Sequence, residues 1–178
     1  VSDRSVAWRV TRHISAIANS NDNGGVIVGF WPTEDDGLFP YFPFSTPNSW
    51  TGSGEIFDDY NGGFFNSSGS VKYGQCWVFA GIVNSMSRSL GIPARTVTNI
   101  GSAHDTLPFD GYIMKYSNAA VALQNNALPR PESIWNFHVW NEAQVNRPDR
   151  STHASIRWQA FDGTPQELSD GLYAGQKL

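Results

Sequence analysis

Residues 73–80 read Tyr73-Gly74-Gln75-Cys76-Trp77-Val78-Phe79-Ala80 and contain the only cysteine of the chain. Apolar residues recur after this cysteine with the i, i+3, i+4, i+7 spacing of a helix that buries one face: Phe79, Ile82, Val83, Met86 and Leu90. Gly91 and Pro93 end the predicted helix, because glycine suits the left-handed position after a helix and proline cannot continue it. Cys76 is therefore predicted in the first turn, where unpaired backbone N–H groups and the helix dipole favour a thiolate.

A cysteine at the start of a helix has two interpretations. A lone cysteine is often a small buried apolar residue, whereas a nucleophile needs an imidazole that takes its proton and a third group that orients the imidazole. His138 lies in an alternating aromatic stretch, 134–142, and Asp162 ends the next predicted strand, 156–162. If these strands are antiparallel neighbours, the two side chains can meet on one face. Spacing alone leaves open that His138 is a core residue and Asp162 a turn former.

The composition limits the class of protein. A chain of 178 residues predicts one domain with a substantial core. The net charge of −4 and the lack of a basic run argue against a nucleic-acid partner. No apolar stretch reaches the about 18 residues of a membrane span. One cysteine excludes an internal disulfide framework and a cysteine-based zinc site. The sequence does not define the compartment, and we expect the cytoplasm rather than secretion.

The rest of the chain alternates between short helices, strands and loops. An amphipathic helix is predicted over residues 5–20, with one face formed by apolar residues at helical spacing: Val6, Val10, Ile14 and Ile17. A short helix over 54–60 is predicted to turn Ile56 and Phe57 inward. The remaining segments are predicted strands over 26–31 and 94–100 and irregular stretches over 32–54, 61–70 and 101–133.

Five different motifs follow one another along the chain. Besides residues 73–80, they are Gly91-Ile92-Pro93-Ala94-Arg95, Ser102-Ala103-His104-Asp105, Trp135-Asn136-Phe137-His138-Val139-Trp140-Asn141-Glu142 and Trp158-Gln159-Ala160-Phe161-Asp162-Gly163-Thr164-Pro165-Gln166-Glu167. Together they resemble the catalytic core of animal-type, calcium-dependent transglutaminases, which belong to the papain-like superfamily. The resemblance implies an α+β fold in which the helix of the cysteine nucleophile packs on an antiparallel sheet. It also implies that residues 1–178 form the N-terminal part of an incomplete core, with the rest of the core and the C-terminal β-barrels absent.

The resemblance assigns a role to individual residues. Cys76 resembles the nucleophile, His138 the general base and Asp162 the acid that orients the base. Trp31 resembles the tryptophan whose indole N–H helps to hold the oxyanion, and Trp135 the second wall of the tunnel through which the amine arrives.

The implied reaction is acyl transfer from a protein glutamine to a lysine or polyamine amine. It runs through a Cys76 thioester and forms isopeptide crosslinks, with deamidation when water replaces the amine. The expected partners are proteins with accessible glutamine and lysine, polyamines, and the remaining half of the same polypeptide.

Calcium is the cofactor that the resemblance implies. The positions that match a structural calcium site of the family lie around the end of the first helix: Ala16, Asn19, Asn21 and Asn23. Carbonyl groups at a helix C-terminus have no intrahelical partner, and the following turn adds oxygen ligands suited to a hard cation. An ordinary helix cap with left-handed asparagines is the alternative. Asn23 stands where the family has an aspartate, and the loop 105–111 carries apolar residues where the family binds a second calcium.

Two other functions remain open. One is a papain-like thiol hydrolase or amidase, and the other is a non-catalytic structural relative. The structural relatives have lost the nucleophile, whereas Cys76 is present here. The tryptophan pair Trp31 and Trp135 favours amine transfer over simple hydrolysis.

Overall fold

The computed structural model of the chain describes residues 6–31, 45–62, 69–104, 133–147, 156–165, 168–169 and 172–173. The helices are α1 (Ala7–Ala18), α2 (Ser20–Asn23), α3 (Ser53–Gly62) and α4 (Cys76–Ser89). The strands are β1 (Ile27–Gly29), β2 (Val71–Gly74), β3 (Ala94–His104), β4 (Ser133–Asn146), β5 (Ile156–Phe161), β6 (Leu168–Ser169) and β7 (Leu172–Tyr173). This mixture of helices with an antiparallel sheet confirms the predicted α+β class. No helix in these described ranges is long and apolar enough to cross a bilayer.

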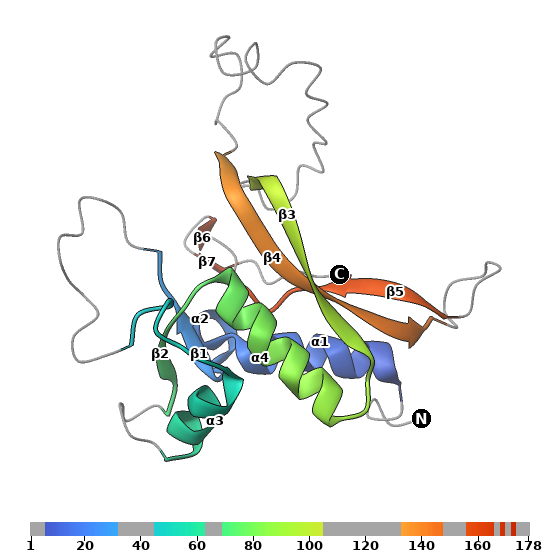
Figure 1. The fold of residues 1–178 in the computed structure, drawn as a ribbon, viewed down its shortest axis with the longest axis horizontal. Coiled ribbons are helices and arrows are strands. Elements are labelled where there is room, and N and C mark those ends of the chain that lie inside the picture. The colour runs from blue at the N-terminus through green and yellow to red at the C-terminus, as the bar shows by residue number, and fades with distance from the viewer. Residues whose placement is uncertain are drawn as a thin grey trace, which may run out of the picture.

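Helix α4 occupies the middle of the fold, with the long antiparallel strands on one side and α3, β1 and β2 on the other (Figure 1). The prediction that Cys76 begins this helix is confirmed. Gly91 follows the helix at a φ of 75°, as its sequence position indicated. Leu90 is a correction: its side chain is 62% exposed, because it is the cap of the helix and has left the buried face.

Strands β3, β4 and β5 form one antiparallel sheet in that order. β3 pairs with β4 from Ala94↔Ala143 to His104↔Ser133, and β4 pairs with β5 from Asn141↔Phe161 to Asn146↔Ile156. The predicted antiparallel neighbours are thus confirmed. The predicted end of β3 at residue 100 is wrong. A glycine favours the end of a strand, and Gly101 has a φ of 63°, but the pairing of β3 with β4 continues in register on both sides of it.

A second, two-stranded sheet pairs β1 with β2 in parallel, from Ile27↔Val71 to Gly29↔Gly74. Strand β2 was not predicted, because four residues with a lysine and a terminal glycine carry little periodic signal. β1 is also shorter than the predicted 26–31. This pairing matters for the site because Trp31 follows β1 and Cys76 follows β2. The parallel pairing places the C-terminal ends of the two strands side by side.

The core lies where α1 and α4 meet the sheets. Its largest fully buried side chains include Phe79, Ile82 and Val83 of α4, together with Ile27 and Ile56. The inward orientation predicted for Ile56 is therefore confirmed.

The apolar face predicted for α1 is only partly right. Ile14 is buried, but Ile17 is 51% exposed, and the other buried positions are Thr11 and Ala18. Residues 11, 14 and 18 share one helical face, whereas Ile17 lies next to it.

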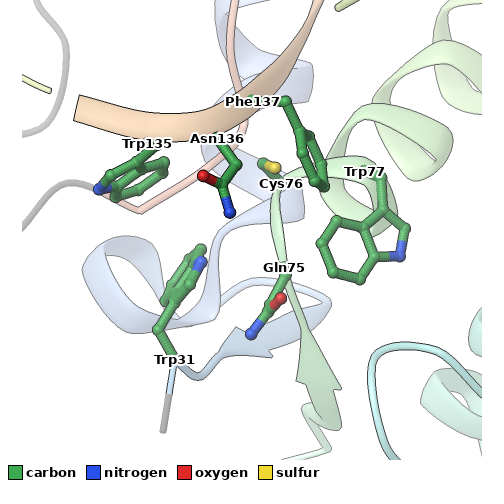
Figure 2. A pocket seen from close by; sticks show the side chains of 7 residues that line it. All are labelled: Trp31, Gln75, Cys76, Trp77, Trp135, Asn136 and Phe137. Carbon is green, nitrogen blue, oxygen red and sulfur yellow. The ribbon is translucent and has the colours of Figure 1, made fainter. Parts of the chain in front are cut away.

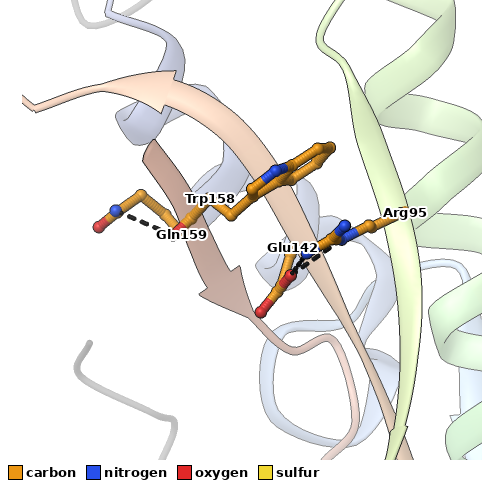
Figure 3. Close-up of polar contacts among 4 residues, drawn as sticks. All are labelled: Arg95, Glu142, Trp158 and Gln159. Carbon is orange, nitrogen blue, oxygen red and sulfur yellow. Dashed lines mark hydrogen bonds and ion pairs between the residues drawn. The ribbon is translucent and has the colours of Figure 1, made fainter. Parts of the chain in front are cut away.

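The opposite face of the main sheet is polar and aromatic. Arg95 of β3 donates two hydrogen bonds to Oε2 of Glu142 on β4, at 3.0 and 2.7 Å, and its guanidinium lies 4.1 Å from the centre of the Trp158 ring on β5 (Figure 3). These contacts join all three strands, although exposed ion pairs contribute little to stability.

Candidate active site

Cys76 lines a pocket of about 350 Å³ at the start of α4. The residues that line it are Trp31, Gln75, Cys76, Trp77, Trp135, Asn136 and Phe137. The cysteine is only 2% exposed and packs against Ala80 and Val139. It therefore combines both interpretations from the sequence, because it is a buried residue and it also forms part of the pocket wall.

His138 and Asp162 are brought together by the β4–β5 pairing. Nε2 of His138 lies 2.6 Å from Oδ2 of Asp162. The other carboxylate oxygen, Oδ1, accepts a hydrogen bond of 2.8 Å from the backbone N–H of Thr164. Asp162 is thus both a turn former and the partner of His138, because Oδ1 accepts the bond of the turn and Oδ2 contacts the imidazole. This bond fixes the orientation of the carboxylate and, through it, of the imidazole.

The imidazole of His138 also interacts with Cys76. Nδ1 is buried and forms no well-aligned hydrogen bond with any residue that the structure describes. Burial lowers the pKa of His138, but the hydrogen bond with Asp162, the interaction with Cys76 and the charges of both groups outweigh it and raise the pKa to about 9. Near neutral pH the ring is therefore protonated.

The two predicted tryptophans stand next to each other. The ring centres of Trp31 and Trp135 are 6.3 Å apart at an angle of 34°. Trp31 also stacks on Phe79. The rings of Trp135 and His138 are nearly perpendicular, with their centres 5.7 Å apart. Figure 2 shows Cys76 between this pair and a second aromatic pair, Trp77 and Phe137. The indole nitrogen of Trp31 is on the edge of the ring that is turned toward the middle of the pocket.

The backbone N–H groups at the start of α4 complete the site. Gln75 is the N-cap residue, and its carbonyl accepts the N–H groups of Val78 and Phe79. The first N–H groups of a helix have no intrahelical acceptor, so that of Cys76 is free of the helix ladder. An oxygen that gains negative charge beside the sulfur can accept a bond from this N–H.

Four lining residues were missed from the sequence: Gln75, Trp77, Asn136 and Phe137. All of them adjoin a predicted site residue along the chain. That adjacency was an available signal for Trp77 and Gln75, which flank a cysteine at a helix start. For Asn136 and Phe137 it was weaker, because side chains alternate between the two faces of a strand.

The predicted calcium positions lie at the end of α1 and along α2. The carbonyl of Ala16 accepts the N–H of Asn19, and the carbonyl of Asn19 accepts the N–H of Gly25. A carbonyl oxygen has two lone pairs, so each can also bind a cation. The side chain of Asn21 bonds the backbone of Gly29 at both its amide atoms, at 2.6 and 3.2 Å. Because the side chain of Asn21 is bonded to Gly29, Asn21 would offer its backbone carbonyl to a cation. Backbone carbonyl oxygens, such as those of Ala16, Asn19 and Asn21, are ligands that suit a hard cation.

Part of the predicted calcium set is outside what the structure describes. The side chain of Asn23 and the loop 105–111 belong to this part. Within the described residues no group of three or more His, Cys, Asp and Glu side chains is placed to hold a metal.

This geometry provides the components of a thiol acyl-transfer site. A sulfur, an imidazole held by a carboxylate, a backbone N–H at the start of a helix and an indole N–H lie around an aromatic pocket. Chemistry of this kind joins a nucleophile to a carbonyl carbon and stabilises the oxyanion that forms.

Comparison with known proteins leads to the same family. The profile of the Transglutaminase-like superfamily matches residues 63–163. The chain is 45% identical over 175 residues to a hemocyte protein-glutamine gamma-glutamyltransferase of Tachypleus tridentatus, covering 96% of this chain and 20% of that protein. It is 43% identical over 176 residues to the coagulation factor XIII A chain of Homo sapiens, covering 97% of this chain and 22% of that protein.

A solved structure agrees with these relatives. The crystal structure of red sea bream transglutaminase matches with a TM-score of 0.66 and 36% identity, covering 94% of this chain and 23% of that one. The chain therefore spans about a fifth of the length of the relatives that it matches. Since the profile covers most of the chain and the relatives are similar over nearly all of it, the chain belongs to the transglutaminase-like superfamily.

Proposed function

We propose that the protein carrying this chain is a protein-glutamine gamma-glutamyltransferase, in which Cys76 is the nucleophile, His138 the proton carrier and Asp162 its orienting acid. The observation that supports this most is the 2.6 Å contact between His138 and Asp162, together with the interaction of the same ring with Cys76. When a histidine held by a carboxylate in this way is neutral, the carboxylate fixes its tautomer and therefore which ring nitrogen can take up a proton.

The first half of the reaction forms a thioester. The thiolate of Cys76 attacks the side-chain carboxamide carbon of a protein glutamine, and the carbonyl electrons move to oxygen. The Cys76 N–H and the Trp31 indole N–H donate to this oxyanion, and each well-placed donor contributes roughly 3 kcal/mol. As the C–N bond breaks, the protonated His138 gives its proton to the leaving nitrogen, and ammonia departs.

The second half transfers the acyl group to an amine. His138 is now neutral and takes a proton from the incoming lysine or polyamine nitrogen, which attacks the thioester carbon. The C–S bond breaks, the sulfur leaves as a thiolate, and an isopeptide bond remains. Trp31 and Trp135 form an apolar passage that admits the hydrocarbon stem of the amine and limits the access of water.

We further propose that calcium binds at the end of α1, through Ala16, Asn19, Asn21 and Asn23. When bound, the ion supplies a positive charge that several carbonyl oxygens share. The clamp of Asn21 on Gly29 links that turn to β1, two residues before Trp31. A calcium ion there would thus restrict the segment that carries the oxyanion donor.

The direct test is incorporation of a fluorescent primary amine into casein by the full-length protein with calcium. We expect incorporation by the parent protein and none by Cys76→Ala. The same samples should release ammonia in proportion to the amine incorporated.

The alternatives give other outcomes in this assay. A thiol hydrolase or amidase would release ammonia, or cleave peptide bonds, without incorporating the amine. A non-catalytic relative would do neither. Amine incorporation that persists in Cys76→Ala would exclude Cys76 as the nucleophile.

A further inference from the structure

Gln75 immediately precedes Cys76, and its side chain forms a hydrogen bond with a distant segment of the chain. As the N-cap residue of α4 it could accept a backbone N–H of its own helix, but its side chain makes no such bond. Instead, Nε2 donates a hydrogen bond of 3.1 Å to the backbone carbonyl of Phe30, 45 residues away. The two residues that this bond connects each precede a residue of the proposed oxyanion site, namely Cys76 and Trp31.

The bond acts on a rigid unit. The carbonyl of Phe30 and the N–H of Trp31 belong to one planar peptide group, so a bond to the carbonyl fixes the plane from which Trp31 extends. The N–H of Phe30 is held in turn by the carbonyl of Gly74, at 3.1 Å. Phe30 is thus held on both sides by the pair of residues that leads into Cys76.

We propose that Gln75 is a positioning residue that sets the place of the Trp31 indole relative to the Cys76 sulfur. Residue Trp31 is 37% exposed, so packing restrains it only in part. Without the Gln75 bond the Phe30–Trp31 peptide can rotate, and the indole N–H leaves the point where the oxyanion forms. This inference rests on the proposed acyl-transfer function.

A competing role for Gln75 is direct donation to the substrate oxygen, since Gln75 also lines the pocket. A double-mutant cycle in the full-length protein separates the two roles. We expect Gln75→Met to lower kcat by about tenfold or more, with less effect on KM, because methionine keeps the length and loses the donor. In the Trp31→Phe background the same change should have little further effect. Losses that multiply in the double variant would overturn the positioning role.

A second measurement does not depend on activity. With 5-fluorotryptophan incorporated, the ¹⁹F resonance that disappears in Trp31→Phe identifies Trp31. Gln75→Met should shift or broaden this resonance and leave that of Trp158 in place. An unmoved Trp31 resonance in a folded Gln75→Met protein contradicts the proposal, even if the activity falls. If Gln75→Met does not fold, Gln75→Glu serves, because a carboxylate of the same length repels the Phe30 carbonyl.

Gln159 provides the matched control. Its Nε2 also donates to a backbone carbonyl, that of Trp158 on β5, at 3.1 Å (Figure 3), and Gln159 is not one of the residues that line the pocket. Gln159→Met should leave kcat and the Trp31 resonance unchanged, and a loss of either would show that the Gln75→Met effect is not specific. Failure of the acyl-transfer proposal looks different: the parent protein would incorporate no amine, while the resonance test would still report on Gln75.

Discussion

At the scale of single residues, the charge of His138 decides what the site can do. A ring with a pKa of about 9 is protonated near neutral pH, so in the proposed reaction it can give a proton to the leaving nitrogen without first acquiring one. With this raised pKa, little of the ring is in the neutral form near neutral pH, and the proposed amine step needs that neutral form as its base. The second step is therefore possible only after the first has removed the proton, which orders the two halves of the reaction.

The stability of the protein should depend on the same proton. The folded pKa of about 9 lies above the ordinary value of 6.5, so the protonated ring stabilises the fold fully below pH 6.5, and this contribution is lost as the pH rises through 9. We expect the free energy of unfolding to fall over this range by on the order of 2 kcal/mol, allowing for solvent screening. Chemical denaturation at a series of pH values measures it.

Asp162→Asn tests the origin of that dependence. It removes the charge and the 2.6 Å contact, so most of the fall between pH 6.5 and 9 should disappear. His13→Gln is the control, because His13 is an exposed histidine on α1, and it should leave the curve unchanged. A curve that is the same in Asp162→Asn and in the parent would show that this pair is not the cause.

Cys76 should be alkylated at a rate that depends on His138. A neighbouring imidazolium stabilises a thiolate, which is the reactive form. We expect His138→Gln to slow the reaction with iodoacetamide at pH 6 to 8 by roughly tenfold or more. Because the chain has one cysteine, mass spectrometry of the peptide that contains Cys76 measures this rate without ambiguity. Equal rates in both proteins would refute the activation.

At the scale of elements, α4 and β4 carry the proposed nucleophile and its proposed base, and a buried amide joins the two elements. Nδ2 of Asn141 on β4 donates a hydrogen bond of 3.0 Å to the carbonyl of Ala80 on α4, and Asn141 is fully buried. Asp162 is placed by a third element, the turn after β5. The distance between this turn and α4 therefore affects whether the three groups meet.

Gly163 makes that close approach possible. A Cβ at this position would lie 2.7 Å from Cγ2 of Val83, a fully buried residue of α4, so one of the two would have to shift. We expect Gly163→Ala to reduce the free energy of unfolding by about 1–3 kcal/mol, because it overpacks the core. Thermal or chemical denaturation measures this change.

Gly81→Ala is the matched control and should have the opposite sign. Gly81 lies inside α4, and a Cβ there would only make an ordinary contact of 3.6 Å with Ser53. Alanine in a helix interior stabilises by about 0.5–1 kcal/mol relative to glycine. If both substitutions destabilise the protein to the same extent, the close approach at Gly163 is not the reason.

The elements also show what the sequence could predict. Helix α4 and strands β4 and β5 were predictable, because each has a clear period and a glycine, proline or polar boundary. Strand β2 was not, since four residues are too few for a period. The roles of Gln75 and Asn21 were hidden for a different reason. Both use side chain to backbone bonds, to Phe30 and Gly29, whose partners have no sequence signature.

At the scale of the whole molecule, a continuous line of contacts runs from α1 to the pocket. The end of α1 leads into α2, Asn21 of α2 clamps Gly29 of β1, and Phe30 is held by Gln75 beside the nucleophile. Because each step is a bond to backbone, a change at the end of α1 can reach Trp31 without a large movement. Calcium bound at the end of α1 would act on Trp31 through these contacts.

The last prediction therefore separates binding of calcium from its effect on the site. In the parent protein, millimolar calcium should raise Tm by several degrees, since an ion at a hundred times its Kd adds about 2.7 kcal/mol, and it should change the alkylation rate of Cys76. Asn21→Ala keeps the backbone carbonyl and loses the clamp on Gly29. In this variant we expect the rise in Tm to persist and the effect on Cys76 to disappear. Asn21→Pro, which distorts the turn itself, should lose both. Magnesium should not replace calcium, because it requires a smaller octahedral site. A parent protein whose melting is indifferent to calcium would end this proposal.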